Sequence, residues 1–103
     1  MAKRRRLPPA LWAQRRRMVW LRDGGRCQGP HCRGAAPIPL AEAQIDHIRP
    51  VSRGGSHRPS NLRVLCARCH ALRADAAHRG LIQRALAAGL IPPDWRALVW
   101  EET

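Results

Sequence analysis

The chain has 103 residues and a formal net charge of +12 at pH 7, from 19 basic and 7 acidic residues. This length suits one domain with a modest core, and such a domain usually needs a metal ion or disulfides as an additional cross-link. The strong positive charge favours a polyanionic partner, nucleic acid before any other, because arginine side chains neutralise phosphates. No apolar run reaches the length of a membrane-spanning helix, so we expect no membrane partner.

Residues 1–9, MAKRRRLPP, combine a run of basic residues with a proline pair and predict a flexible basic arm. Such an arm either lies against a phosphate backbone or is simply solvated. The composition does not separate these two interpretations.

Residues 10–23, ALWAQRRRMVWLRD, repeat apolar side chains loosely at helical spacing and precede a glycine pair, so they predict a helix. We interpret Trp12 and Trp20 as residues that pack against the metal-stabilised centre of the domain. Arg15, Arg16 and Arg17 are candidate contacts to phosphate.

Four further elements are expected after a loop rich in Cys, Gly and Pro. They are a strand over 42–48, a strand over 61–65, a helix over 66–80 that ends near Gly80, and one more helix after Gly80 that ends at Gly89. A short amphipathic tail follows. The order strand, loop, strand, helix therefore forms the centre of the chain.

The four cysteines form two close pairs, Cys27-x4-Cys32 and Cys66-x2-Cys69. This spacing fits a tetrahedral zinc site better than a disulfide framework, and no signal-peptide pattern precedes it, so we expect a reducing, cytoplasmic compartment. Four thiolates leave no open position on the metal, so the zinc is expected to be structural. His31 could replace one ligand, but we interpret it as a polar loop residue because four cysteines suffice.

Several polar residues near the cysteines are not needed for a zinc site. Asp46 is a hard oxygen ligand for magnesium, and His47 has the ordinary pKa that suits a general base near neutral pH. Neighbours on a regular strand point to opposite faces, so these two share a site only if the strand is distorted or ends there. His70 lies about 100° further round the helix than Cys69 and is expected to point toward a second site.

The stretches DHIRPVSRGG, SNLRVLC and CARCHALR carry Asp46-His47, Asn61 and His70 in a spacing that resembles the HNH endonuclease motif, the ββα-metal element of small phage and bacterial nucleases. The resemblance covers about residues 20–75. It implies a small α+β fold stabilised by zinc, with a ββα-metal core flanked by N- and C-terminal helices. It also implies a nuclease domain over residues 10–80 and a C-terminal helical extension over 81–103 packed on the same domain.

Carried over position by position, the resemblance makes His47 the general base for water. Asp46 and His70 become the ligands of one catalytic divalent cation, and Asn61 becomes the residue that holds the loop and orients His47. A hard, partly hydrated ligand set of this kind suits magnesium or manganese.

Four positions depart from the family pattern or lie outside it. Arg73 stands where many relatives have lysine, so it is a candidate phosphate contact. Ala74 stands where many relatives have threonine. The bacterial toxin branch of the family has a third metal-binding histidine at this position, and this chain does not. We interpret His57 as a loop residue and His78 as an exposed helix residue.

Each of the four motif residues alone has an ordinary alternative, such as capping a turn or lying on the polar surface. Together they favour a magnesium-dependent DNA endonuclease, which should nick because it has one active site per chain. A zinc-stabilised DNA-binding protein without catalysis and an RNA-binding zinc-knuckle protein are the alternatives, and both leave the four residues without a function. The resemblance suggests a phage setting with terminase as a partner, while restriction, mobile elements and the oligomeric state stay open.

Overall fold

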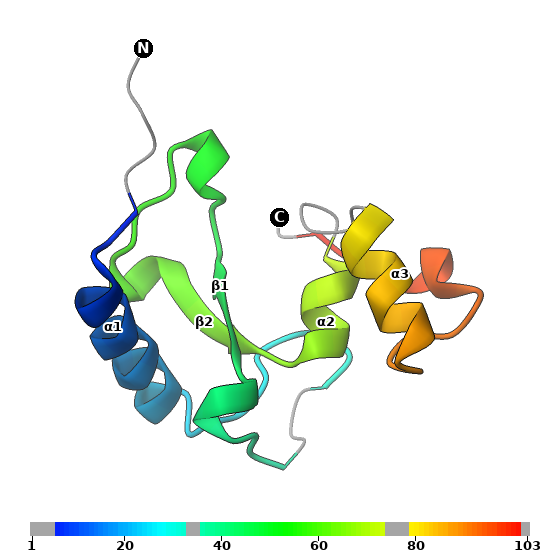
Figure 1. Ribbon diagram of the computed structural model, residues 1–103, viewed down its shortest axis with the longest axis horizontal. Helices are drawn as coiled ribbons and strands as arrows, with labels where there is room; N and C mark the ends of the chain where they lie inside the picture. The colour runs from blue at the N-terminus through cyan, green and yellow to red at the C-terminus, as the bar shows by residue number, and fades with distance from the viewer. Residues whose placement is uncertain (1–5, 33–35, 74–78, 102–103) are drawn as a thin grey trace.

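The computed structural model describes residues 6–32, 36–73 and 79–101. Its helices are α1 (Pro9–Arg22), α2 (Ala67–Leu72) and α3 (Arg79–Ala87), and its strands are β1 (Gln44–His47) and β2 (Leu62–Leu65). The strands cross in the middle of the molecule, with α1 on one side and with α2 and α3 on the other (Figure 1). The small α+β fold expected from the sequence is therefore confirmed.

The two strands form an antiparallel sheet in which Asp46 lies opposite Arg63 and His47 lies opposite Leu62. Directly opposed residues share one face of a sheet, and neighbours along a strand alternate between faces. His47 and Leu62 therefore face α1, whereas Asp46 and Arg63 face α2. Asp46 and His47 leave β1 on opposite sides, at the last two positions of the strand.

The helix α1 covers the first face of the sheet. Proline at its first position suits a helix N-terminus, and Gly24 and Gly25 end the helix with positive φ angles of 65° and 69°. Its apolar side chains join a buried cluster of Val19, Ala43, Leu62 and Val64, on which Trp12, Trp20, Ile38 and Ile45 pack. Both tryptophans are packing residues, as expected, but they pack on this cluster and not on the cysteines.

The C-terminal part of the chain packs on α2. The buried residues of this second cluster come from α2, α3 and the turn after α3: Ala71, Leu72, Ile82, Ala85 and Ile91. Trp100 packs against the same cluster, and its backbone N–H donates to the Leu72 carbonyl over 3.0 Å. The helix α3 ends before Gly89, which has a φ of 70°, as the sequence predicted.

The helix predicted over 66–80 is shorter than expected, because α2 ends at Leu72. Arg73 has extended backbone angles (φ −68°, ψ 131°) and forms a parallel bridge with Trp100. Gly80 then lies in the first turn of α3 and does not end the preceding helix. Tertiary pairing of Arg73 therefore outweighs the helical propensity of the alanine-rich segment.

Some of the expectations fall outside the described residues: those for residues 1–5 of the basic arm, for Ala74 and for His78. In the described ranges both strands begin later than predicted, since residues Leu40–Glu42 form a 3-10 turn before β1 and residues Pro59–Asn61 form another before β2. Across those same ranges, we find no helix with the length and apolar character that crossing a membrane requires.

Candidate functional site

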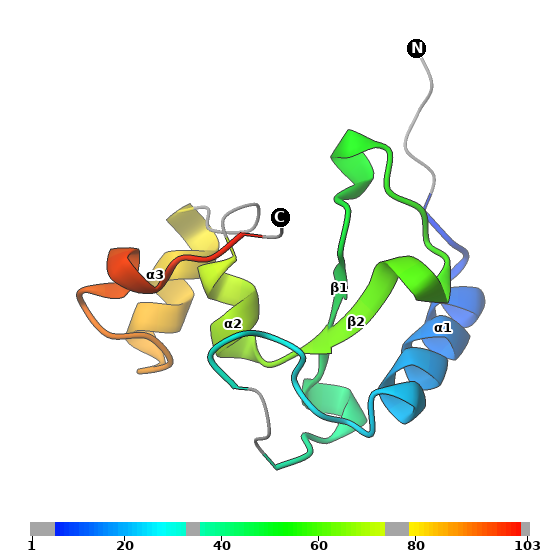
Figure 2. The ribbon, with the colours of Figure 1, turned by 180° about the vertical axis from the view of Figure 1, so that it is seen from behind.

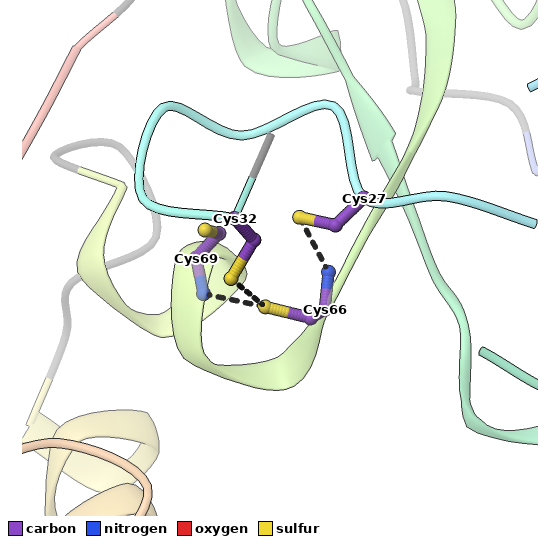
Figure 3. Close-up of side chains that lie close together, drawn as sticks. All are labelled: Cys27, Cys32, Cys66 and Cys69. Carbon is purple, nitrogen blue, oxygen red and sulfur yellow. Dashed lines mark hydrogen bonds between the residues drawn. The ribbon is translucent and has the colours of Figure 1, made fainter. Parts of the chain in front are cut away.

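The four cysteines converge at one point between the loop after α1 and the start of α2 (Figure 3). Their sulfur atoms all lie within 4.8 Å of one another, and all four are free thiols. In a tetrahedral zinc site with Zn–S bonds of about 2.3 Å, the sulfurs lie about 3.8 Å apart. The cluster can therefore hold one metal ion of this kind. The view from behind shows the loop after α1, drawn in cyan, passing beside α2 (Figure 2).

Besides the contact of 3.4 Å between Cys32 Sγ and Cys66 Sγ, the sulfurs accept hydrogen bonds from three backbone amides and one guanidinium group. The pairs are Gly29 N to Cys27 Sγ (3.3 Å), Cys66 N to Cys27 Sγ (3.2 Å), Cys69 N to Cys66 Sγ (3.3 Å) and Arg68 Nη2 to Cys32 Sγ (3.2 Å). Such donors stabilise charged sulfur. A side chain at Gly29 would not fit, since its Cβ would lie 2.6 Å from Cys69 Sγ.

The ionisation of the cluster is divided unevenly among the thiols. Hydrogen bonds with the Cys66 and Cys69 side chains lower the pKa of Cys27 to about 3. Hydrogen bonds with the Cys27 and Cys66 side chains, together with burial, raise the pKa of Cys69. Four thiolates in so small a space need a cation, so the donor set fits a bound divalent metal. His31 lies elsewhere, with its Nε2 at 2.7 Å from the Leu98 carbonyl oxygen.

Asp46 is buried on the α2 face of the sheet, with 6% of its surface exposed. Its Oδ2 accepts hydrogen bonds from Arg73 Nη1 at 2.6 Å and from Arg63 Nε at 3.0 Å. Both guanidinium groups also lie near the ring of Trp100, at 5.1 Å for Arg63 and 5.9 Å for Arg73. A metal ion at Asp46 would therefore share the carboxylate with two guanidinium groups.

Arg73 connects the end of α2 to the end of β1. In addition to Asp46, its guanidinium group donates to the backbone carbonyls of His47 and Ile48. Only 2% of the residue is exposed, so in this position it presents no surface to a phosphate. The phosphate contact expected from the sequence remains a prediction that requires Arg73 to leave these partners.

His47 is half-buried on the opposite face, where α1 covers it. Its ring is stacked on Trp12, with the ring centroids 5.7 Å apart and an interplanar angle of 2°. Its Nε2 lies 2.9 Å from Nδ1 of His57. Burial, followed by the electrostatic interaction with His57, lowers the pKa of His47 below its ordinary value of 6.5. His47 is therefore held as a neutral imidazole at neutral pH.

His57 is the residue that the sequence interpretation missed. It is in the loop between the strands, as expected, but it lies beside His47 and does not stand apart from the site. No spacing rule indicates this contact, because the loop conformation brings the two rings together. A cavity of about 380 Å³ adjoins both histidines, and its lining consists of Arg6, Leu7, Pro9, Trp12, His47 and His57.

Asn61 holds the loop between the two strands closed. Its Oδ1 accepts from the Arg49 N–H at 2.8 Å, and its Nδ2 donates to the carbonyls of Arg49 (3.1 Å) and Ser56 (2.8 Å). Its own carbonyl accepts from the N–H of Ile48, the residue after His47, at 2.8 Å. Asn61 thus connects the two ends of the loop, while its role in orienting His47 remains a prediction.

The arginines of α1 and the last motif residue occupy different environments. Arg15 donates to the carbonyl of His57, and Arg16 donates to the Leu40 carbonyl at 2.9 Å, whereas Arg17 is exposed.

His70 is half-buried on α2, and its carbonyl accepts from the Arg73 N–H at 3.3 Å. Phosphate contacts for the α1 arginines and metal binding by His70 remain predictions. In the part of the chain that the structure describes, only the cysteines gather three or more His, Cys, Asp or Glu ligands.

A two-stranded antiparallel sheet followed by a helix, with an Asp-His pair at the end of the first strand and a cysteine metal cluster beside the helix, defines a small metal-binding ββα protein. Residues 27–75 match the family model of the HNH endonuclease. The chain therefore contains an HNH endonuclease domain, which confirms the resemblance, and this domain indicates a nuclease with a nucleic-acid substrate. Neither the curated proteins nor the solved structures contained a match to the chain.

Proposed function

We propose that this protein is a metal-dependent DNA endonuclease in which His47 is the general base. The observation that carries the proposal is the environment of His47, a neutral imidazole at the end of β1 beside a cavity of about 380 Å³. A base with a pKa below neutral is unprotonated at physiological pH and can accept a proton from water.

In the proposed reaction His47 accepts a proton from the water whose oxygen attacks phosphorus. As the new bond between the water oxygen and phosphorus forms, the bond between phosphorus and the 3′ oxygen breaks. The 3′ oxygen takes a proton from solvent water, so the products are a 5′ phosphate and a 3′ hydroxyl. Asp46 leaves β1 on the face opposite His47, so one phosphate can meet both residues only at the end of the strand. There Asp46 and His70 would hold magnesium or manganese, an ion that would stabilise the negative charge developing on the phosphate and on the leaving oxygen. Asn61 keeps the loop beside His47 in place.

The cysteine cluster would hold a structural zinc ion, since four thiolates complete a closed tetrahedral shell. A net charge of +12 supports largely sequence-independent binding to the DNA backbone. One active site per chain supports nicking of one strand at a time. A role beside a phage terminase during genome packaging rests on the family resemblance alone.

A second function, DNA binding without catalysis, is favoured by one observation. Two arginine side chains already occupy Oδ2 of Asp46. If a metal ion cannot displace these arginines from the Asp46 carboxylate, the chain keeps the nuclease fold but does not bind the catalytic cation.

Nicking of supercoiled plasmid DNA by the zinc-loaded protein separates the two functions. Wild type, His47→Ala and His31→Ala are compared with magnesium or manganese and with a chelator. His31 is an exposed histidine away from the sheet, so its alanine variant is the matched control. Loss of a general base lowers the rate by about 10²- to 10⁴-fold.

We expect wild type and His31→Ala to nick, and His47→Ala to retain zinc and DNA binding but to lose cleavage. Cleavage by His47→Ala at the wild-type rate would exclude His47 as the base. If no variant cleaves but all bind DNA with a steep salt dependence, the protein is a binding module.

A further inference from the structure

We infer that His57, which lies outside the HNH motif, is a positioning residue that sets the tautomer of His47. The inference rests on the proposed function, because it concerns the atom with which His47 acts as a base. The main evidence for it is the hydrogen bond of 2.9 Å between His47 Nε2 and His57 Nδ1.

The His57 ring is held in place by contacts from several elements. Arg15 of α1 donates to the His57 carbonyl. The ring lies edge-on to Trp12, at 6.2 Å between centroids, and edge-on to His47, at 5.1 Å. Since Trp12 is also stacked on His47, the indole restrains both imidazole rings, and the hydrogen bond between them keeps a defined direction.

A neutral imidazole carries one N–H and one nitrogen with a free lone pair. A hydrogen bond between the two rings therefore has one donor and one acceptor, and two arrangements are possible. If His57 donates, His47 accepts at Nε2 and carries its proton on Nδ1, so neither nitrogen of His47 can receive another proton. If His47 donates from Nε2, its Nδ1 lone pair stays available for the proton of water.

Only the second arrangement is compatible with general-base chemistry at His47. His57 Nδ1 then accepts the Nε2–H of His47, and His57 carries its own proton on Nε2. When His47 takes the proton of water on Nδ1, the Nε2–H remains bonded to His57, and no further proton transfer is required. His57 thus aligns the base without touching the substrate.

The first test measures the tautomer directly and does not depend on cleavage. In ¹⁵N-labelled wild-type protein at mildly alkaline pH, the imidazole ¹⁵N shifts of His47 should show a protonated Nε2 and an unprotonated Nδ1. His47→Gln identifies the His47 signals by their loss. A His47 protonated at Nδ1 would overturn the inference.

The second test compares two substitutions of similar size. His57→Asn places a carbonyl oxygen near the position of Nδ1 and keeps an acceptor, whereas His57→Leu has none. We expect His57→Leu to lower kcat by about 10- to 100-fold with little change in KM, since a misaligned catalytic group costs this much. His57→Asn should recover most of the lost rate, which a purely structural role for the ring would not produce.

Equal kcat values for wild type and His57→Leu overturn the inference, and so does a His57→Asn variant as slow as His57→Leu with wild-type zinc content and melting temperature. If wild type itself does not cleave DNA, the proposed function fails, while the tautomer of His47 still decides whether His57 is the acceptor. The two failures are therefore distinguishable.

Discussion

Replacement of Arg73 by methionine tests whether this buried arginine holds the helix and the sheet together. The guanidinium group donates to Asp46 Oδ2 at 2.6 Å and to the carbonyls of His47 and Ile48, and the residue is 2% exposed. Methionine keeps a long, flexible apolar side chain but removes the charge and every donor. Asp46 then retains Arg63 at 3.0 Å, and two backbone carbonyls lose this donor.

Removal of one partner from a buried ion pair costs about 3 to 5 kcal/mol, because the other charge remains buried. Arg63 still pairs with Asp46, so we expect the lower end of this range, a loss of about 3 kcal/mol in the free energy of unfolding. With a urea slope of about 1.5 kcal/mol per M, the midpoint of unfolding should fall by about 2 M. Arg73→Lys keeps the charge without the planar fork of donors and should lie between wild type and methionine.

Urea unfolding followed by tryptophan fluorescence measures this change, since Trp100 lies beside Arg73. Zinc is kept in excess so that metal binding contributes equally to every variant. Arg17→Met is the matched control at an exposed position of α1 and should change stability by less than about 0.5 kcal/mol. A loss below about 1 kcal/mol for Arg73→Met would refute the assignment of Arg73 as the buried link between α2 and β1.

Three further predictions concern the cysteine cluster, the loop and the base. Gly29→Ala places a Cβ at 2.6 Å from Cys69 Sγ, so we expect a lower melting temperature and weaker zinc retention; wild-type zinc content after dialysis would contradict this. Asn61→Ala removes the side-chain hydrogen bonds to Arg49 and to the carbonyl of Ser56 and should cost about 1 to 3 kcal/mol in urea unfolding, so an unchanged midpoint would argue against its loop role. Because burial lowers the pKa of His47, the acidic limb of kcat/KM against pH should break below 6.5, and a break at or above 6.5 would contradict a buried base.

The spacing of residue types along the chain was enough to predict the metal cluster, the family domain and most of the secondary structure. The two cysteine pairs predicted a metal cluster, and the four sulfurs do converge within 4.8 Å. The spacing of Asp46-His47, Asn61 and His70 predicted an HNH domain, and residues 27–75 match that family. The first helix and both strands also form within the predicted segments, apart from one residue at the start of the helix. These features follow from short-range periodicity, turn residues and ligand spacing, all of which are readable along the chain.

Only the tertiary structure decided what surrounds the predicted site residues. Trp12 lies far from His47 in the chain, and the packing of α1 brings it to the His47 ring. His57 is in the irregular loop between the strands, and the conformation of that loop brings it to the same ring. The sequence did not indicate that Arg73 is buried either, because a cationic side chain in a basic sequence is expected at the surface. Its burial depends on the buried carboxylate of Asp46, which only the fold places beside it. Pairing of Arg73 with Trp100 also ended α2 earlier than its sequence indicated. Residue type and spacing specify which groups are present, but the direction of each side chain depends on contacts between distant segments that form only when the chain folds.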